Sequence, residues 1–161
     1  MGARTQAREA ALQMLFAVEA GGTEVERAIS DFWAELPAED AEGRPYADAL
    51  VRGVLDDLEK TDAQIKKASQ NWRLERMTRV DRNVLRMGAW ELLARTDVPR
   101  AVILDEAVEV AKRFGTEESG AFVNGVLDRI AENLGRTDTD GATSKPGATS
   151  KPGAPPKPDA S

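Results

Sequence analysis

The sequence contains no cysteine and no histidine, and these two absences exclude several kinds of chemistry. Without cysteine there is no disulfide framework, no thiolate nucleophile and no zinc-thiolate site. Without histidine the commonest general base and metal ligand is missing, so the Glu-x-x-His pairs of di-iron bundles cannot form. No glycine-rich phosphate loop follows a strand pattern. We therefore predict that the protein is not an enzyme and that it uses no metal and no cofactor.

Long apolar runs are missing as well. No stretch approaches the roughly 20 apolar residues that a membrane-spanning helix needs. The start of the chain, from Met1 to Arg4, lacks the apolar core of a signal peptide. Apolar residues nevertheless make up 41% of the 161 residues, enough for one domain with its own core. We therefore expect a soluble cytoplasmic protein with no part in the membrane.

Basic residues are outnumbered by acidic ones, 22 against 28, and the net charge of −6 argues against indiscriminate nucleic-acid binding. Charge effects reach about 10 Å at ordinary salt, so local basic patches can still act. The segment from Lys66 to Arg86 is the conspicuous basic one, with seven basic residues against two acidic ones. A solvated or salt-bridged face is the commoner meaning of such a run. Any RNA contact should therefore be small and should rely on base recognition more than on bulk charge.

Apolar residues recur at helical spacing along most of the chain, which predicts an all-α protein. We predict about seven helices in two small bundles, an amino-terminal one over about residues 3–70 and a carboxy-terminal one over about 71–135. The composition changes abruptly after Gly135, and the hexapeptide Ala-Thr-Ser-Lys-Pro-Gly then occurs twice in succession. Because such a segment buries nothing, residues 136–161 are expected to form a disordered tail.

Local signals mark one helix of the carboxy-terminal half. Thr78, with Asp81 three residues later, predicts a helix start. Gly88 lies inside this helix and costs about 1 kcal/mol relative to alanine. Close approach of a neighbouring helix would explain a glycine at that position.

The stretch from Leu104 to Arg129 holds two helical segments with a break at Gly115. Gly115 is expected to be a C-cap of the first segment, and Thr116 an N-cap of the second. The residues expected to be buried are Ala107, Val108, Ala111 and Phe114 in the first segment, and Phe122, Val123, Val126, Leu127 and Ile130 in the second. From periodicity alone, this stretch is a helical hairpin that only builds core.

The identity of the residues in this stretch is more specific than their periodicity. The runs Asp105-Glu106-Ala107, Ala111 to Gly115 and Phe122 to Leu127 resemble the carboxy-terminal signature of the NusB family of transcription antitermination factors. Two further runs, Val80 to Arg86 and Trp90 to Leu93, resemble the second motif of that family. The resemblance extends over about residues 3–134.

This resemblance implies a function. NusB-family proteins bind boxA-type single-stranded RNA together with the ribosomal protein NusE, as part of the RNA polymerase antitermination complex, and so support ribosomal RNA transcription. The expected RNA-binding residues lie at the amino terminus and at the corner after Gly115: Arg4, Gln6, Arg8, Lys112, Arg113, Thr116, Glu117, Ser119, Phe122 and Asn124. Arg4 and Arg8 are expected to contact phosphates, and Phe122 to offer a stacking surface. Asp81, Arg82 and Glu106 are the expected NusE contacts.

Two other interpretations stay open. The same helical domain occurs fused to ribosomal RNA cytosine methyltransferases, but this chain has no room for the methyltransferase fold and no cysteine to attack the base. The other interpretation is a non-catalytic helical interaction module without RNA-binding activity. Such a module includes a homodimer, because some NusB-family proteins are thought to pair and so mask the RNA surface.

Overall fold

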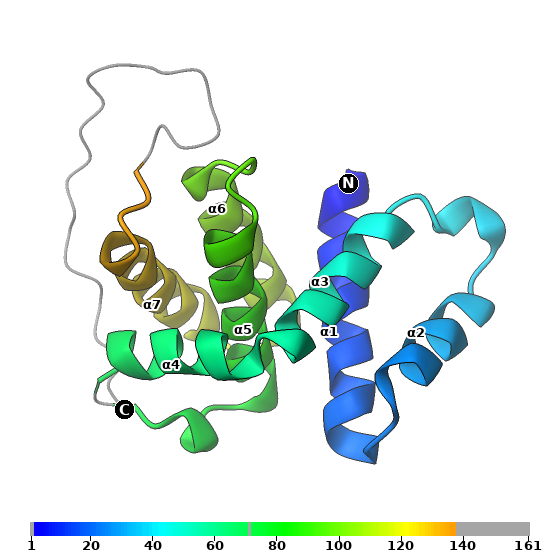
Figure 1. Cartoon of the computed structure of the whole chain (residues 1–161), viewed down its shortest axis with the longest axis horizontal. Helices are drawn as coiled ribbons and strands as arrows, with labels where there is room; N and C mark the ends of the chain where they lie inside the picture. The colour runs from blue at the N-terminus through cyan, green and yellow to red at the C-terminus, as the bar shows by residue number, and fades with distance from the viewer. Residues whose placement is uncertain (1, 71, 138–161) are drawn as a thin grey trace. The chain divides into compact units, whose positions relative to one another are not determined.

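The computed structural model describes residues 2–70 and 72–137. Within these residues the regular secondary structure is helical, with no β-strand (Figure 1). Seven α-helices and two one-turn 3-10 helices follow one another within the described part: α1 (Ala3–Gly21), α2 (Val25–Ala34), η1 (Ala38–Asp40), α3 (Arg44–Asp56), α4 (Leu58–Ala68), η2 (Leu74–Arg76), α5 (Arg79–Ala94), α6 (Arg100–Phe114) and α7 (Ser119–Asn133). The predicted all-α fold of about seven helices is confirmed. None of the described helices is long and apolar enough to cross a membrane.

The chain divides into two compact units, an amino-terminal unit that ends at Asp56 and a carboxy-terminal unit that begins at Asp57. The predicted division near residue 70 differs from this boundary. Helix α4 belongs to the carboxy-terminal unit because it packs against α5 and α7. A break between α3 and α4 at Asp57 therefore separates the units, although the sequence there has no glycine or proline.

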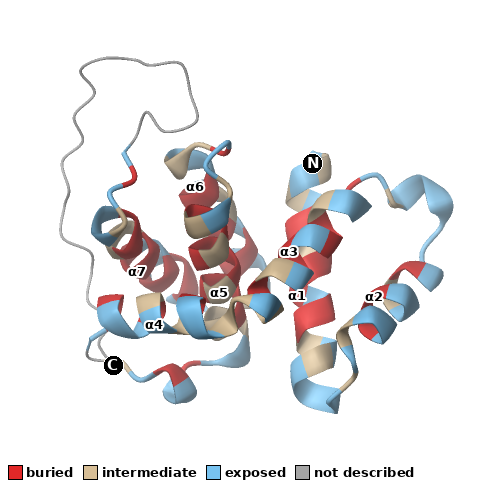
Figure 2. Ribbon diagram, in the orientation of Figure 1, coloured by how far each residue is buried: buried red, intermediate tan, exposed pale blue. Residues whose placement is uncertain are grey.

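The amino-terminal unit is built on α1, which packs against α3 and α2. Figure 2 shows buried residues along α1 and α3, and the largest of them include Leu12, Met14 and Leu50. Gly43 lies against α1, since a side chain there would come within 2.6 Å of the Ala3 carbonyl oxygen. The start of α3 is thereby held close to the start of α1.

The carboxy-terminal unit packs α6 on α7 and α5, and α4 on α5 and α7. Its core includes Leu85, Ile103 and Leu127, all fully buried. A Cβ atom at Gly88 of α5 would lie 2.6 Å from Leu127 Cδ1 of α7. The expected close approach of a neighbouring helix at Gly88 is therefore confirmed.

Two details of this unit concern the predicted boundaries. The hydroxyl of Thr78 accepts the backbone N–H of Asp81 at 3.1 Å, which confirms the predicted start of α5. The fold continues past Gly135, because Arg136 is buried and donates to the backbone carbonyls of Leu92 and Val98 at 2.8 and 2.7 Å. The prediction that the tail begins at residue 136 is therefore wrong for Arg136. Its residues 138–161 lie outside the described part of the chain.

Candidate nucleic-acid interface

The amino-terminal candidates project from the first turns of α1 onto Tyr46 of α3. The guanidinium carbon of Arg4 lies 4.4 Å from the centroid of the Tyr46 ring, and that of Arg8 lies 5.3 Å from it. Arg8 also donates to the Tyr46 hydroxyl at 3.3 Å. An aromatic face within about 6 Å attracts a cation. The ring of Tyr46 therefore positions both arginines.

The two arginines differ in exposure. Arg4 is exposed, whereas Arg8 is only 2% exposed. Arg8 was expected to contact phosphate, and its burial argues against this expectation. Its position faces α3, so the side chain is enclosed between the two helices. Arg4 keeps a charge that solvent and a phosphate can reach.

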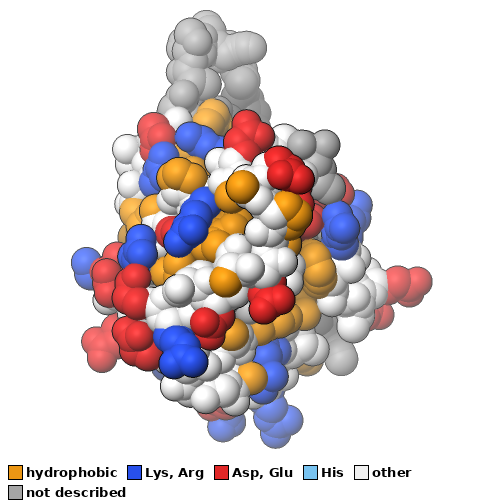
Figure 3. Space-filling model, turned by 90° about the vertical axis from the view of Figure 1, so that its right-hand side faces the viewer, with side chains coloured by type: hydrophobic (Ala, Val, Ile, Leu, Met, Phe, Trp, Pro, Cys, Tyr) orange, Lys and Arg blue, Asp and Glu red, His pale blue; other side chains and the backbone are white. Residues whose placement is uncertain are grey.

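Gln6 is exposed on α1 and lines an open hollow of about 270 Å³ within the amino-terminal unit. The wall of the hollow includes Phe32, Trp33 and Leu36. Leu36 is one of the exposed large apolar residues, at 37%. Figure 3 looks onto the side of the protein that carries α2 and shows apolar side chains exposed between charged ones.

The corner between α6 and α7 spans Gly115 to Glu118. Ser119 organises it, because its hydroxyl oxygen accepts the backbone N–H of Thr116 at 3.0 Å. Thr116 was expected to be the N-cap of α7, and this expectation is wrong. The helix begins at Ser119, three residues later, with Glu118 as its N-cap. Gly115 has an extended backbone instead of a left-handed one, with φ −105° and ψ −152°. Glycine fits there because any side chain would collide with Ser119 and the Ala111 carbonyl.

The predicted corner residues separate into exposed and buried groups. The exposed group comprises Lys112, Arg113, Thr116, Glu117 and Asn124. The buried group comprises Ser119 and Phe122, which are 1% and 8% exposed. The burial of Ser119 follows from its hydrogen bond inside the corner. Its predicted contact with RNA is therefore not supported by the structure, and Ser119 acts by shaping the backbone.

The two phenylalanines of this region differ in exposure. Phe122 was expected to belong to the apolar face of its helix and also to offer a stacking surface; it is buried and packs edge-on against Trp72, with ring centroids 6.1 Å apart. Phe114 was expected in the core and is instead 36% exposed, because Val110 and Ala111 occupy the inward positions of α6. The guanidinium of Arg113 lies 5.7 Å from the Phe114 ring. The accessible ring at the corner is therefore that of Phe114.

The three residues expected to contact NusE have different surroundings in the structure. Arg82 donates to the backbone carbonyls of Met77 and Leu74, at 3.0 and 3.5 Å, and so holds the η2 segment against α5. Asp81 and Glu106 are half-buried. Burial raises the pKa of the Asp81 carboxyl, and hydrogen bonds from Ser119 and Thr78 oppose that rise. Asp81 Oδ1 is buried without a hydrogen-bond partner among the described residues.

Asp81, an expected NusE contact, and Ser119, an expected RNA contact, both belong to the carboxy-terminal unit. The hydroxyl of Ser119 bonds the corner backbone, and it also opposes the rise in the pKa of the Asp81 carboxyl. The candidates on α1 belong to the other unit. Among the described residues, no cluster of three or more acidic side chains is placed to hold a metal ion.

The model of the NusB family matches residues 5–132, which is more than three quarters of the chain. The chain belongs to the NusB family. It is 71% identical over 140 residues to the transcription antitermination protein NusB of Sorangium cellulosum, covering 87% of this chain and 99% of that protein. It is 46% identical over 139 residues to the protein of the same name from Myxococcus xanthus, covering 84% and 99%.

Solved NusB structures share the fold. A structure of T. maritima NusB has 40% identity and a TM-score of 0.72, and the match covers 80% of this chain and 90% of that one. A crystal structure of the antitermination factors NusB and NusE in complex with dsRNA has 27% identity and a TM-score of 0.73, and covers 83% and 98%.

Within this NusB-family chain, sequence patterns missed two features of the candidate interface. The contact of Tyr46 with Arg4 and Arg8 has no signal in the sequence, because nothing in it pairs residues about 40 positions apart. Phe114 was placed in the core by helical periodicity, which does not register where the neighbouring helix ends. The one available signal was the basic residue Arg113 directly before an aromatic one at a helix end.

Proposed function

We propose that this NusB-family protein is a transcription antitermination factor that binds boxA-type single-stranded RNA together with NusE. In this role it supports ribosomal RNA transcription within the RNA polymerase antitermination complex. The observation that carries the proposal is the 71% identity to a transcription antitermination protein NusB over 99% of that protein. A related structure in which NusB and NusE are bound to RNA supports the two partners.

RNA is proposed to contact two separate sets of residues, one in each unit. Arg4 contributes from α1, where its charge is exposed and its direction is set by Tyr46. At the corner, Lys112 and Arg113 supply charge for phosphates, and the exposed Phe114 ring supplies the stacking surface first expected of Phe122. Single-stranded RNA is commonly bound by such a combination of cations and aromatic faces.

The acidic residues of the corner decide which part of the RNA lies there. Glu117 and Glu118 occupy the turn before α7, where the helix dipole would otherwise favour a phosphate. Two exposed carboxylates repel a phosphate at that position. We therefore place bases and ribose hydroxyls, which can donate to carboxylates, against Glu117, and we place Thr116 and Asn124 beside them as further polar contacts.

NusE is proposed to bind Asp81 and Glu106, the half-buried acidic residues of α5 and α6. Arg82 supports this region by bonding the carbonyls of the η2 segment. The protein is proposed to act by binding alone, since its sequence has neither histidine nor cysteine for catalysis. A role in bacterial transcription carries with it the expected cytoplasmic location.

The test is the binding of a fluorescently labelled boxA RNA to the full-length protein, with and without NusE, at 50 and 200 mM salt. We expect NusE to tighten binding and added salt to weaken it, because counterions are released from the RNA. The variant Arg113→Gln should lose affinity for RNA, while Arg27→Gln, at an exposed position of α2, should retain it.

A folded protein that binds no boxA RNA with or without NusE would contradict the proposed function. Light scattering of the same samples measures the molecular mass. A dimer that dissociates when RNA is added would support the masking of the RNA surface by a second copy. A dimer that persists and binds no RNA would support the interaction module instead.

A further inference from the structure

The basic segment from Lys66 to Arg79 lies in the carboxy-terminal unit, at the end of α4 and in the connection to α5. It holds five basic residues and one acidic residue, Glu75, in a chain whose net charge is −6. The basic residues that follow it are structural. Arg86 forms two hydrogen bonds with Asp62 at 2.8 and 3.0 Å, and Arg82 bonds backbone carbonyls.

The earlier members of the segment face solvent. Lys66, Lys67, Arg73 and Arg76 are all exposed. Arg73 approaches Glu75 at 3.9 Å, but both side chains are about two-thirds exposed, so this ion pair contributes little. Within residues 2–70 and 72–137, no carboxylate pairs with Lys66, Lys67 or Arg76. These charges are therefore available to a ligand with negative charge.

Trp72 lies among these charges and differs from the other two tryptophans. The indole N–H groups of Trp33 and Trp90 donate to Asp48 and Asp57, at 2.8 and 3.2 Å. Trp72 is half-buried, and its indole N–H donates to none of the described residues. A partly exposed aromatic ring with an unused donor, in a segment of the sequence rich in exposed cations, has the chemistry of a stacking platform for a nucleic-acid base.

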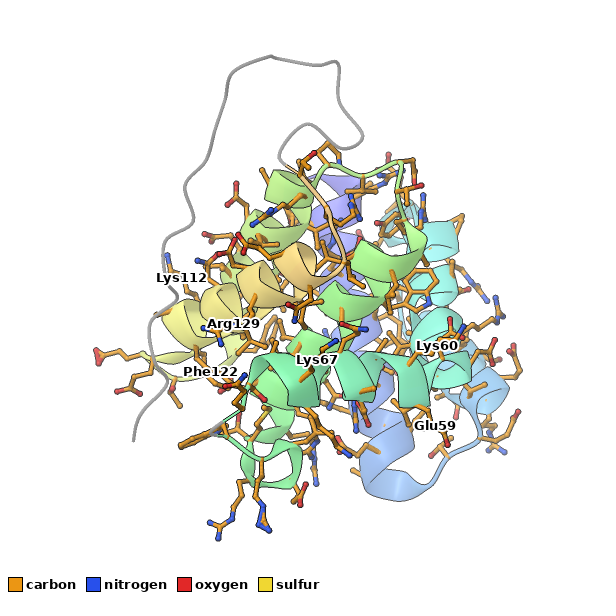
Figure 4. The ribbon with its side chains drawn as sticks, turned by 60° about the vertical axis from the view of Figure 1, so that its left-hand side comes forward. Glu59, Lys60, Lys67, Lys112, Phe122 and Arg129 are labelled. Carbon is orange, nitrogen blue, oxygen red and sulfur yellow. The ribbon has the colours of Figure 1, made fainter. Side chains whose placement is uncertain are left out.

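Trp72 also connects this region to the proposed RNA surface. Its ring packs edge-on against Phe122 of α7. Figure 4 shows Lys67 of α4 on the same side of the unit as Phe122 and Arg129 of α7, with Lys112 of α6 farther along. An RNA strand that leaves the corner at Lys112 could therefore continue toward Trp72 without leaving this unit.

We propose that Lys66, Lys67, Trp72, Arg73 and Arg76 form a second RNA-binding surface, here called the α4–α5 surface. It binds single-stranded RNA that flanks the boxA sequence. A base stacks on Trp72, and the lysines and arginines contact the phosphates on either side. This inference rests on the proposed function, since it presumes that boxA RNA occupies the corner.

The test compares two labelled RNAs, a boxA RNA of about twelve nucleotides and the same RNA with about ten uridines added at each end, a length that covers one ordinary single-strand site. Both are titrated with the full-length protein in complex with NusE. For the variant Arg73→Gln/Arg76→Gln we expect about a tenfold loss of affinity for the extended RNA, and a salt slope lower by about 1.4. Affinity for the short RNA should be unchanged.

The matched control is Arg27→Gln/Lys60→Gln, which removes two exposed charges elsewhere and should leave both affinities unchanged. Equal affinity of the wild-type protein and the Arg73→Gln/Arg76→Gln variant for the extended RNA would overturn the inference while leaving the proposed function intact. Failure of the wild-type protein to bind either RNA would overturn both. Weaker binding of NusE by this variant, with unchanged RNA affinity, would assign the surface to a protein partner and also overturn the inference.

Tryptophan fluorescence tests the stacking on Trp72 directly. Addition of the extended RNA should quench the fluorescence of the wild-type protein, because a stacked base quenches an indole. The variant Trp72→Phe should keep most of its affinity and lose most of the quenching. Quenching that persists in Trp72→Phe would show that the base stacks elsewhere and would overturn this contact.

Discussion

The guanidinium of Arg8 donates to the hydroxyl of Tyr46 at 3.3 Å, and this bond joins α1 to the start of α3. Arg8 is 2% exposed, whereas Arg4, one turn earlier, is exposed and stacks on the same ring. One aromatic residue therefore gives two similar arginines different roles. Arg8 is enclosed within the amino-terminal unit, and Arg4 keeps an exposed charge.

Replacement of Arg4 should affect RNA binding, and replacement of Arg8 should affect the free energy of unfolding. Arg4→Gln should lower the salt slope of RNA binding by about 0.7, since one phosphate contact is lost, and should leave the free energy of unfolding nearly unchanged. Arg8→Leu should lower the free energy of unfolding by about 1–3 kcal/mol, because a buried charged hydrogen bond is lost. Urea unfolding and RNA titration measure the two effects. An Arg8→Leu variant as stable as wild type would contradict the structural role.

Arg136 should be needed for the stability of the carboxy-terminal unit. Its two hydrogen bonds satisfy the carbonyls of Leu92 and Val98, and its own carbonyl accepts a hydrogen bond from Arg100 at 2.8 Å. A chain that ends at residue 135 should therefore lose about 2–4 kcal/mol of unfolding free energy, because buried carbonyls are left without donors. A chain that ends at Thr137 keeps Arg136 and is the control. Equal stability of the two truncated chains, measured by urea unfolding, would contradict this prediction.

The elements that could be predicted from the sequence are those determined by residues close to one another in the chain. Helical periodicity gave the seven helices, and the Thr78 cap depends on residues three positions apart. The burial of Arg8 and the exposure of Phe114 depend on which helix packs above them, and no local pattern contains that information. The boundary at Asp57 was missed for the same reason, because α4 is assigned to its unit by contacts with α5 and α7. For the proposed site, Lys112 and Arg113 are exposed at the corner, whereas Phe122 is buried and Phe114 carries the exposed ring.

Gly88 should resist substitution although it lies inside a helix. Alanine would gain about 1 kcal/mol of helix propensity, but its Cβ would lie 2.6 Å from Leu127 Cδ1, in a core where Leu127 is 0% exposed. Because overpacking costs about 1–3 kcal/mol, we expect a net loss of about 1 kcal/mol in unfolding free energy. The control is Gly120→Ala, which meets Lys112 Cγ at 3.1 Å, a side chain that can move into solvent. A Gly88→Ala variant more stable than wild type would show that α5 and α7 do not pack this closely.

Asp81 should make the stability of the protein depend on pH. Burial raises the pKa of its carboxyl in the folded state, so the stability that it contributes is present at low pH and lost as the pH rises through that raised pKa. Asp81→Asn mimics the protonated carboxyl and keeps a partner for Ser119. The variant should match wild type at acidic pH and become more stable than wild type as the pH rises to 7.5. Urea unfolding between pH 4.5 and 7.5 measures the difference, and a constant or reversed difference would contradict the burial of this charge. NusE affinity measured on the same samples at pH 7.5 should fall if Asp81 contacts NusE, and unchanged affinity would leave Asp81 with only its structural contact to Ser119.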